Sequence, residues 1–158
     1  MADEKQLSEK DWDKKFAIDI FNAIWQLLGK NDRTPNENEK MLQMAYASCY
    51  HWGEVGTALN QARGEWMISH VNIILERSEA ALHHAKRSLA ICEENKYGDF
   101  DLAYAYEGMA RASALNHDPD NFKKYHLLAD QAAQQIKGEE DRKVFDGDLI
   151  SEPWFGMK

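Results

Sequence analysis

The stretch from Ala58 to Arg77, ALNQARGEWMISHVNIILER, constrains the fold of this chain more than any other. At 100° per residue, its apolar side chains cover well over half of the circumference of a helix. A helix that is apolar this far round is held between neighbouring helices. One narrow polar stripe remains, formed by Glu65, Ser69, Asn72 and Glu76. We therefore expect this helix to be the buried member of a hairpin, with residues 78–95 forming its partner.

Helix start and stop signals divide the rest of the chain in a similar way. Ser8 followed by Asp11 predicts one helix start, and Thr34 followed by Pro35 predicts another. The breaker-rich segments GKNDRTPNEN, EENKYGDFD, HDPDN and KGEEDRK separate apolar-periodic stretches, and Gly98 is the expected left-handed residue at a helix end. The sequence thus predicts one all-α domain of six to seven helices. Its parts are about three antiparallel hairpins at residues 8–53, 56–96 and 99–137, then a short capping helix and an aromatic tail at 139–158.

Two of these hairpins can be aligned with each other. Glu65 and Ser69 align with Glu107 and Arg111 at an offset of 42 residues, and Ala81 aligns with Phe122 at an offset of 41. Repeats of this length that each form one helix pair are typical of an α-solenoid, because a single hairpin cannot bury its own apolar face.

Segments of the second and third hairpins resemble the tetratricopeptide repeat (TPR) superfamily. EAALHHAKRSLAICEEN is similar to the second helix of that repeat, with Ala81 and Ser88 at its small positions, and AYAYEGMARASAL resembles its first helix. The resemblance covers about residues 60–136 and extends to bacterial proteins of this broad type. The offset exceeds the family's 34 residues, which implies longer helices or loops. The resemblance implies a TPR-like α-solenoid in which the first helix of every pair lines a concave surface.

On that arrangement, the polar stripes would form adjacent rows in one groove that suits hydrogen bonding to a peptide or polar ligand. These candidate binding residues are Glu65, Ser69, Asn72, Tyr104, Glu107 and Arg111. The alternative is that they are the solvated faces of two helices. Arg63, Trp66 and His70 are secondary candidates, which either grip an anionic ligand or belong to the core.

Composition and motif spacing argue against several other functions. A formal net charge of -8 disfavours nucleic acid and anionic membranes. The six histidines lack HxxxH or HExxH spacing, and CxxC, GxSxG and phosphate-loop motifs do not occur, so we expect no metal, no cofactor and no catalytic residue. The two cysteines are expected to be reduced core thiols. The charged start MADEKQLSEKDWDKK has no apolar signal region, and we expect a soluble, cytoplasmic protein.

These observations predict a non-enzymatic module that binds a protein or peptide in a concave helical groove. The alternative is a small-ligand-binding regulatory domain, in which a polar pocket lies between the same helices and Arg111 fixes an anionic group. The tail adds a further possibility, because Trp154 and Phe155 are costly to leave in water. They either fold back on the last helices or dock into a second subunit, giving a homodimer.

Overall fold

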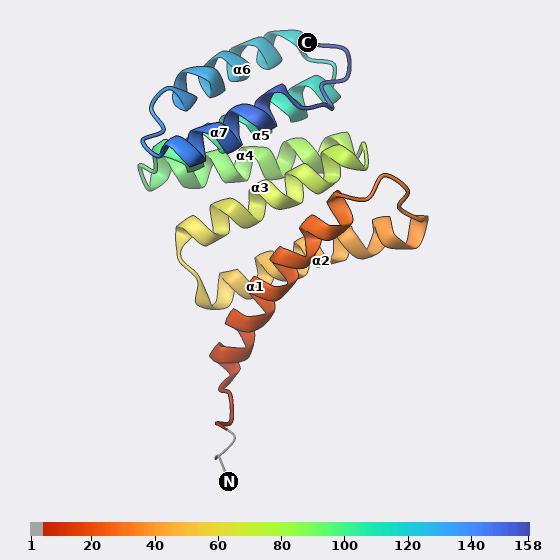
Figure 1. Ribbon diagram of the computed structural model, residues 1–158, viewed down its shortest axis with the longest axis vertical. Coiled ribbons are helices and arrows are strands. Elements are labelled where there is room, and N and C mark those ends of the chain that lie inside the picture. The colour runs from red at the N-terminus through yellow and green to blue at the C-terminus, as the bar shows by residue number, and fades with distance from the viewer. Residues whose placement is uncertain (1–4) are drawn as a thin grey trace.

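The computed structural model describes residues 5–158, and over these residues the chain forms seven helices and no strand (Figure 1). The all-α prediction is confirmed. The first four residues of the charged N-terminal start lie outside the described residues. The helices are α1 (Glu9–Leu28), α2 (Pro35–Val55), α3 (Ala58–Ile74), α4 (Ser78–Glu94), α5 (Asp99–Leu115), α6 (Pro119–Ala133) and α7 (Glu139–Ile150).

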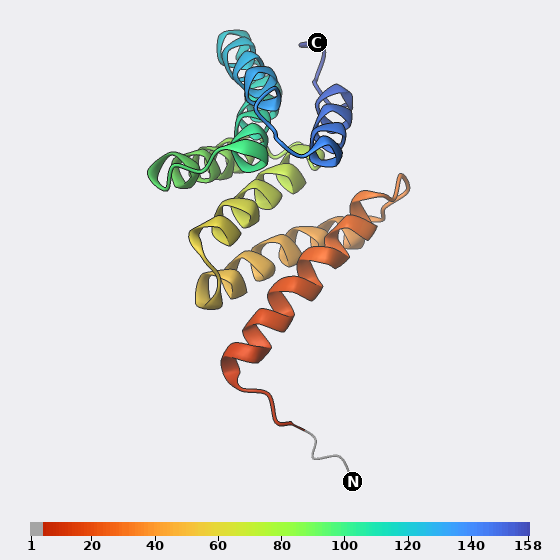
Figure 2. The same ribbon diagram turned by 60° about the vertical axis from the view of Figure 1, so that its left-hand side comes forward.

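Consecutive helices pair as hairpins that stack in chain order. Helix α1 packs on α2, α3 on α4, and α5 on α6, while α2 contacts α3 and α4 contacts α5. Helix α3 also packs directly on α5, which places α3 between three neighbours, as its nearly all-round apolar surface predicts. Figures 1 and 2 show the N-terminal part of α1 extending beyond α2, with α6 at the opposite end of the molecule.

The first two helices begin where their capping residues predict. The backbone N–H of Asp11 donates to Ser8 Oγ at 3.2 Å, and the Asp11 carboxylate accepts the Ser8 N–H in return at 3.0 Å. Thr34 and Glu37 form the same reciprocal pair at the start of α2, where Pro35 takes the first helical position. Each pair satisfies backbone donors that a helix start otherwise leaves open.

Helices α3, α4 and α5 end in three equivalent turns. The second residue after each helix takes a left-handed conformation, with φ of 56° at Glu76, 54° at Lys96 and 55° at His117. The N–H of the next residue then donates to the carbonyl five residues earlier and closes the turn, at 2.8 to 3.0 Å. The expectation for Gly98 is therefore wrong, because Lys96 takes the left-handed position. Gly98 is extended and caps the start of α5.

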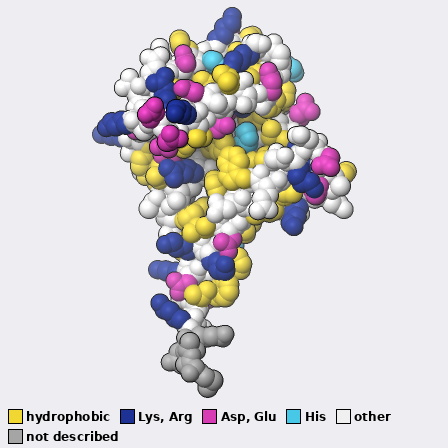
Figure 3. All heavy atoms as spheres, viewed as in Figure 1, with side chains coloured by type: hydrophobic (Ala, Val, Ile, Leu, Met, Phe, Trp, Pro, Cys, Tyr) yellow, Lys and Arg dark blue, Asp and Glu magenta, His cyan; other side chains and the backbone are white. Residues whose placement is uncertain are grey.

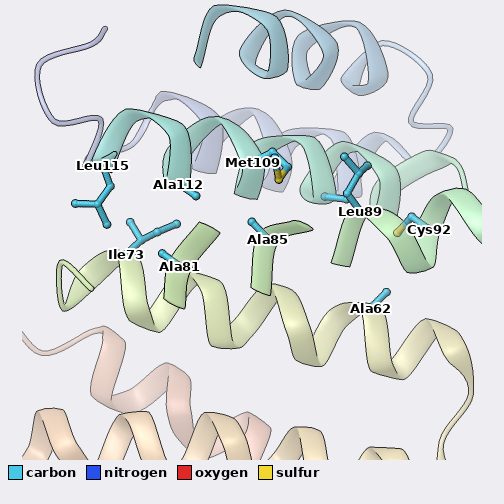
Figure 4. Packing of buried hydrophobic residues seen from close by; sticks show 10 residues of the cluster. Ala62, Ile73, Ala81, Ala85, Leu89, Cys92, Met109, Ala112 and Leu115 are labelled. Carbon is cyan, nitrogen blue, oxygen red and sulfur yellow. The ribbon is translucent and has the colours of Figure 1, made fainter. Parts of the chain in front are cut away.

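Small side chains let α3, α4 and α5 approach closely. Ala81, Ala85 and Ala112 are fully buried where these helices meet (Figure 4). The hydroxyl of Ser69 donates to the Ala81 carbonyl at 2.8 Å, and that of Ser88 donates to the Ala62 carbonyl at 2.9 Å. Side chains thus bond directly to the backbone of the facing helix, which only a tight crossing permits.

Glycine and cysteine provide a similarly close contact between α2 and α3. A Cβ at Gly64 would lie 2.9 Å from Cys49 Sγ, so a larger residue there would push the helices apart. Cys49 and Cys92 are both free thiols. Burial raises the pKa of each to about 11, which keeps them protonated and poorly nucleophilic at neutral pH.

The C-terminal segment folds back onto the last helices. Trp154 is fully buried in a cluster with Phe122 of α6 and Phe145 of α7, with ring centroids of Trp154 and Phe122 5.7 Å apart. Of the two arrangements considered for the tail, the chain adopts the one in which Trp154 folds back.

None of the helices within residues 5–158 combines the length and the apolar character that crossing a membrane requires.

Candidate binding cleft

An open cleft of about 630 Å³ lies between α1, α3, α5 and α7. Hydrophobic side chains gather in the hollow between α1 and α7 on the face seen in Figure 3. The cleft is lined by Phe21 and Trp25 of α1, Ala62, Arg63 and Trp66 of α3, Ser88 of α4, Asp99, Phe100, Asp101, Tyr104 and Ala105 of α5, and Asp141, Val144 and Asp148 of α7. The first helices of the hairpins therefore share a hollow, and α7 forms its far wall.

Trp66 forms the floor of the cleft. Its ring stacks on Trp25 and on His70, with centroids 6.1 and 4.9 Å apart, and makes an edge-type contact with the Tyr104 ring at 5.3 Å. The indole N–H donates to the Glu107 carboxylate at 2.9 Å. Gly108 leaves room for this ring, since a Cβ there would approach Trp66 Cδ1 to 3.2 Å. Trp66 is thus fixed in position, which suits a surface for another molecule to contact.

Tyr104 connects the floor to the far wall. Its hydroxyl donates to the Asp148 carboxylate of α7, and its ring packs against Phe100 at 4.6 Å and Phe145 at 4.9 Å. Burial and the hydrogen bond to Asp148 both raise the pKa of the Tyr104 phenol. The hydroxyl therefore remains a neutral donor that holds α7 against α5.

A buried ion pair lies directly beneath the floor. Glu107 and Arg111, one turn apart on α5, form a salt bridge with almost no exposure. Arg111 also donates to the carbonyls of Ser151 at 2.8 Å, Pro153 at 3.1 Å and Asp148, and its guanidinium lies 4.1 Å from the Trp154 ring centroid. Four N–H groups of Arg111 are thus engaged inside the protein. The structure therefore corrects the expectation that Arg111 holds an anionic ligand, because the side chain anchors the C-terminal segment instead.

Most of the predicted polar stripe is likewise internal. Ser69 and Asn72 are fully buried, and the Asn72 amide donates to the Ile68 carbonyl of its own helix at 2.8 Å. Glu65 is 7% exposed and faces α4 rather than the cleft. Of the six primary candidates, Tyr104 alone lines the cleft. The predicted row of exposed polar side chains is therefore wrong.

The offset of 42 residues also misaligns the two hairpins by one residue. The left-handed residues Glu76 and His117 are equivalent, and their spacing is the 41 residues that separate Trp66 from Glu107. Aligning Glu65 with Glu107 shifts one helix by a single residue, which rotates its side chains by about 100°. Glu65 and Glu107 consequently point toward different neighbouring helices.

The secondary candidates lie closer to the cleft than the primary ones. Arg63 and Trp66 line it, and His70 lies against the inner face of Trp66. Burial lowers the pKa of His70, which favours the neutral imidazole. Arg63 donates two hydrogen bonds to the Asp101 carboxylate, at 2.7 and 3.1 Å. These contacts argue against anion binding by Arg63, Trp66 and His70, because the Arg63 guanidinium is already paired with Asp101.

Sequence reasoning missed the contribution of α1 and α7. Phe21 and Trp25 lie four residues apart on α1, and Phe21 also packs at the border of the core that α1 shares with α2 and α3. A second apolar face on one helix is the signal that could have revealed them. Asp141 and Asp148 lie seven residues apart on α7, which is about two helical turns, so they share one face of that helix.

A second network of hydrogen bonds lines a smaller cavity of about 300 Å³ between α2, α3 and α4. His84 Nδ1 lies 2.6 Å from the Glu65 carboxylate, and His84 Nε2 lies 3.2 Å from the Tyr46 hydroxyl. Arg87 donates to the other Glu65 oxygen at 2.9 Å. Burial opposes ionisation of Glu65, but these hydrogen bonds lower its pKa. The network holds three helices together through one carboxylate.

Within residues 5–158, no three or more His, Cys, Asp or Glu side chains converge in a way that could hold a metal ion.

Comparison of the chain with protein-family models, with curated proteins and with solved structures finds no match.

Proposed function

We propose that this chain is a non-enzymatic, TPR-like interaction module that holds a segment of another protein in the cleft between α1, α3, α5 and α7. The observation that carries the proposal is the exposure of Trp25 at a fixed position. It is 44% exposed, yet it is stacked on the fixed ring of Trp66 at the mouth of the cleft. Tryptophan in such a position provides a large contact area at a low cost in side-chain entropy.

The shape of the cleft supports a segment rather than an enclosed small molecule. Its volume is within the range of ligand sites, but it continues onto the open face of α1. Ile18 is exposed and lies seven residues before Trp25, so it extends the same helix face beyond the cleft. A chain segment can cover both the hollow and this extension. The alternative of an anionic small ligand loses its anchor, since Arg111 is engaged elsewhere.

Selection of phage-displayed random peptides on the full chain tests the proposal. We expect the selected peptides to lose most of their affinity for Trp25→Ala, because that change removes the exposed ring over Trp66. Trp12→Ala is the matched control: Trp12 is also 44% exposed on α1, but it stacks with Phe16 outside the cleft. Failure to select any peptide, or equal loss with both variants, would contradict the proposal.

A further inference from the structure

We infer that the segment held in the cleft presents a cationic side chain, arginine or lysine, to the exposed aromatic rings of the cleft and the carboxylates near them. This inference rests on the proposed function and adds the chemistry of the partner. It follows from the ring faces that are left open, from the charges around them and from a parallel elsewhere in the chain.

The open ring faces lie at the mouth of the cleft. Trp66 is half-buried and stacks on both Trp25 and His70, so much of this indole is already in contact within the chain. Trp25 stacks on Trp66 yet remains 44% exposed, and Phe100 is half-buried beside Tyr104. The face of an aromatic ring carries partial negative charge and attracts a cation.

The charged side chains that line the cleft are strongly unbalanced. Asp99 and Asp101 at the start of α5 face Asp141 and Asp148 on α7 across the hollow, and Arg63 is the one basic residue among the described residues that line it. Asp101 already neutralises Arg63 through two hydrogen bonds. Asp148 accepts the Tyr104 hydroxyl, and Asp99 and Asp141 remain exposed in the same lining as the aromatic rings. A cation in the cleft can therefore interact with rings and carboxylates together. An acidic segment would meet repulsion at the same place.

The same chemistry occurs inside the chain. The Arg111 guanidinium lies over the buried Trp154 ring while its N–H groups bond to oxygen atoms, and the Lys158 ammonium lies 5.3 Å from the centroid of the same ring. An arginine over Trp25 with its N–H groups on Asp141 would repeat that arrangement at the surface. The net charge of -8 further favours the approach of a basic partner.

Fluorescence anisotropy with labelled model peptides tests the inference. The probes are a short peptide of alternating Arg and Leu, and two peptides of equal length with Gln or Glu in place of Arg. We expect the Arg peptide to bind about tenfold more tightly than the Gln peptide, the gain expected from a desolvated cation–π contact with charge-assisted hydrogen bonds. The Glu peptide should bind most weakly, and added NaCl should weaken the Arg peptide selectively.

Charge-matched variants locate the effect. The pair Asp99→Asn and Asp141→Asn, both exposed residues of the cleft, should weaken the Arg peptide about tenfold. The pair Glu94→Gln and Glu140→Gln makes the same change in net charge outside the cleft and should leave the affinity unchanged. Melting temperatures of all variants verify that they remain folded.

The outcomes separate this inference from the proposed function. If the phage-selected peptides bind at Trp25 but contain no excess of Arg and Lys, or if the Gln peptide binds as tightly as the Arg peptide, the cationic assignment is overturned and the segment-binding cleft stands. An equal loss with both double variants overturns it as well, because the effect is then one of net charge alone. If neither selected nor model peptides bind, the proposed function fails too.

Discussion

At the scale of single residues, the chain places its most polar side chains where they organise its interior. Glu107 accepts hydrogen bonds from Trp66 on one side and from Arg111 on the other, so one carboxylate positions both the floor of the cleft and the anchor of the C-terminal segment. Removing one charge from a buried pair leaves the other without compensation, which costs more than the pair itself contributes.

This asymmetry gives a prediction for Arg111. We expect Arg111→Met to lower the free energy of unfolding by about 3–5 kcal/mol, because Glu107 is then buried as an unpaired charge and three carbonyls lose their donor. Adding Glu107→Gln should recover part of that loss, since no charge remains to be compensated. Urea unfolding of the single and double variants measures both effects.

Arg142 on α7 provides the control for this prediction. It forms a one-turn pair with Asp146 in which both side chains are well exposed. Arg142→Met should therefore change stability by about 0.5 kcal/mol or less. Additive losses for the Arg111 and Glu107 changes would show that the two residues do not act as a pair.

The residue scale also shows where reading the sequence reaches its limit. The polar positions on α3 and α5 were predicted to face a groove or water, and most of them are buried instead. Polar residues on an otherwise apolar helix can face water or can bond to a neighbouring backbone, as Ser69 does with Ala81. Periodicity is the same in both cases, and the choice depends on how closely the next helix approaches.

At the scale of helices, sequence signals work best where the chemistry is local. The capping boxes at Ser8 and Thr34 involve residues three apart, and both helix starts were predicted. Helix ends were harder to read, because Glu76, Lys96 and His117 occupy a position that usually holds glycine. The seventh helix supplies two cleft carboxylates, and no local pattern shows that it returns along α5.

The left-handed turn after α4 gives a prediction of unusual sign. A residue other than glycine pays about 1–2 kcal/mol for this conformation. We therefore expect Lys96→Gly to stabilise the protein by about 1 kcal/mol, after the larger backbone entropy of glycine in the unfolded chain is taken into account. Thermal or urea unfolding measures the change.

The same substitution elsewhere on this helix is the natural control. Lys86 is exposed in the interior of α4, where glycine should cost about 1 kcal/mol relative to a good helix former. Lys96→Gly and Lys86→Gly remove the same charge from one element but should have opposite effects. A loss of stability in both would mean that the Lys96 side chain contributes more than its backbone strain costs.

At the scale of the whole molecule, the C-terminal segment closes the stack of hairpins. An end hairpin leaves one apolar face without a neighbour, and here α7 and the tail cover part of it through Phe145 and Trp154. The opposite end differs: α1 leaves large apolar side chains exposed, among them Trp12, Phe16 and Trp25. The cleft thus lies between the end that α7 and the tail cover and the end where α1 leaves apolar side chains exposed.

This arrangement predicts what Trp154 does in the whole protein. Because its ring is fully buried against Phe122 and under Arg111 in its own chain, Trp154→Ala should cost about 3–5 kcal/mol of stability. It should leave the mass measured by light scattering unchanged, whereas a tail docked into a second subunit would lose the dimer and show a melting temperature that depends on protein concentration. Trp12→Ala, at an exposed indole, should alter stability far less. A fall in mass upon Trp154→Ala with little loss of stability would instead place this ring in a neighbouring subunit. The contacts that hold α7 as a wall of the cleft would then not come from Trp154 of the same chain.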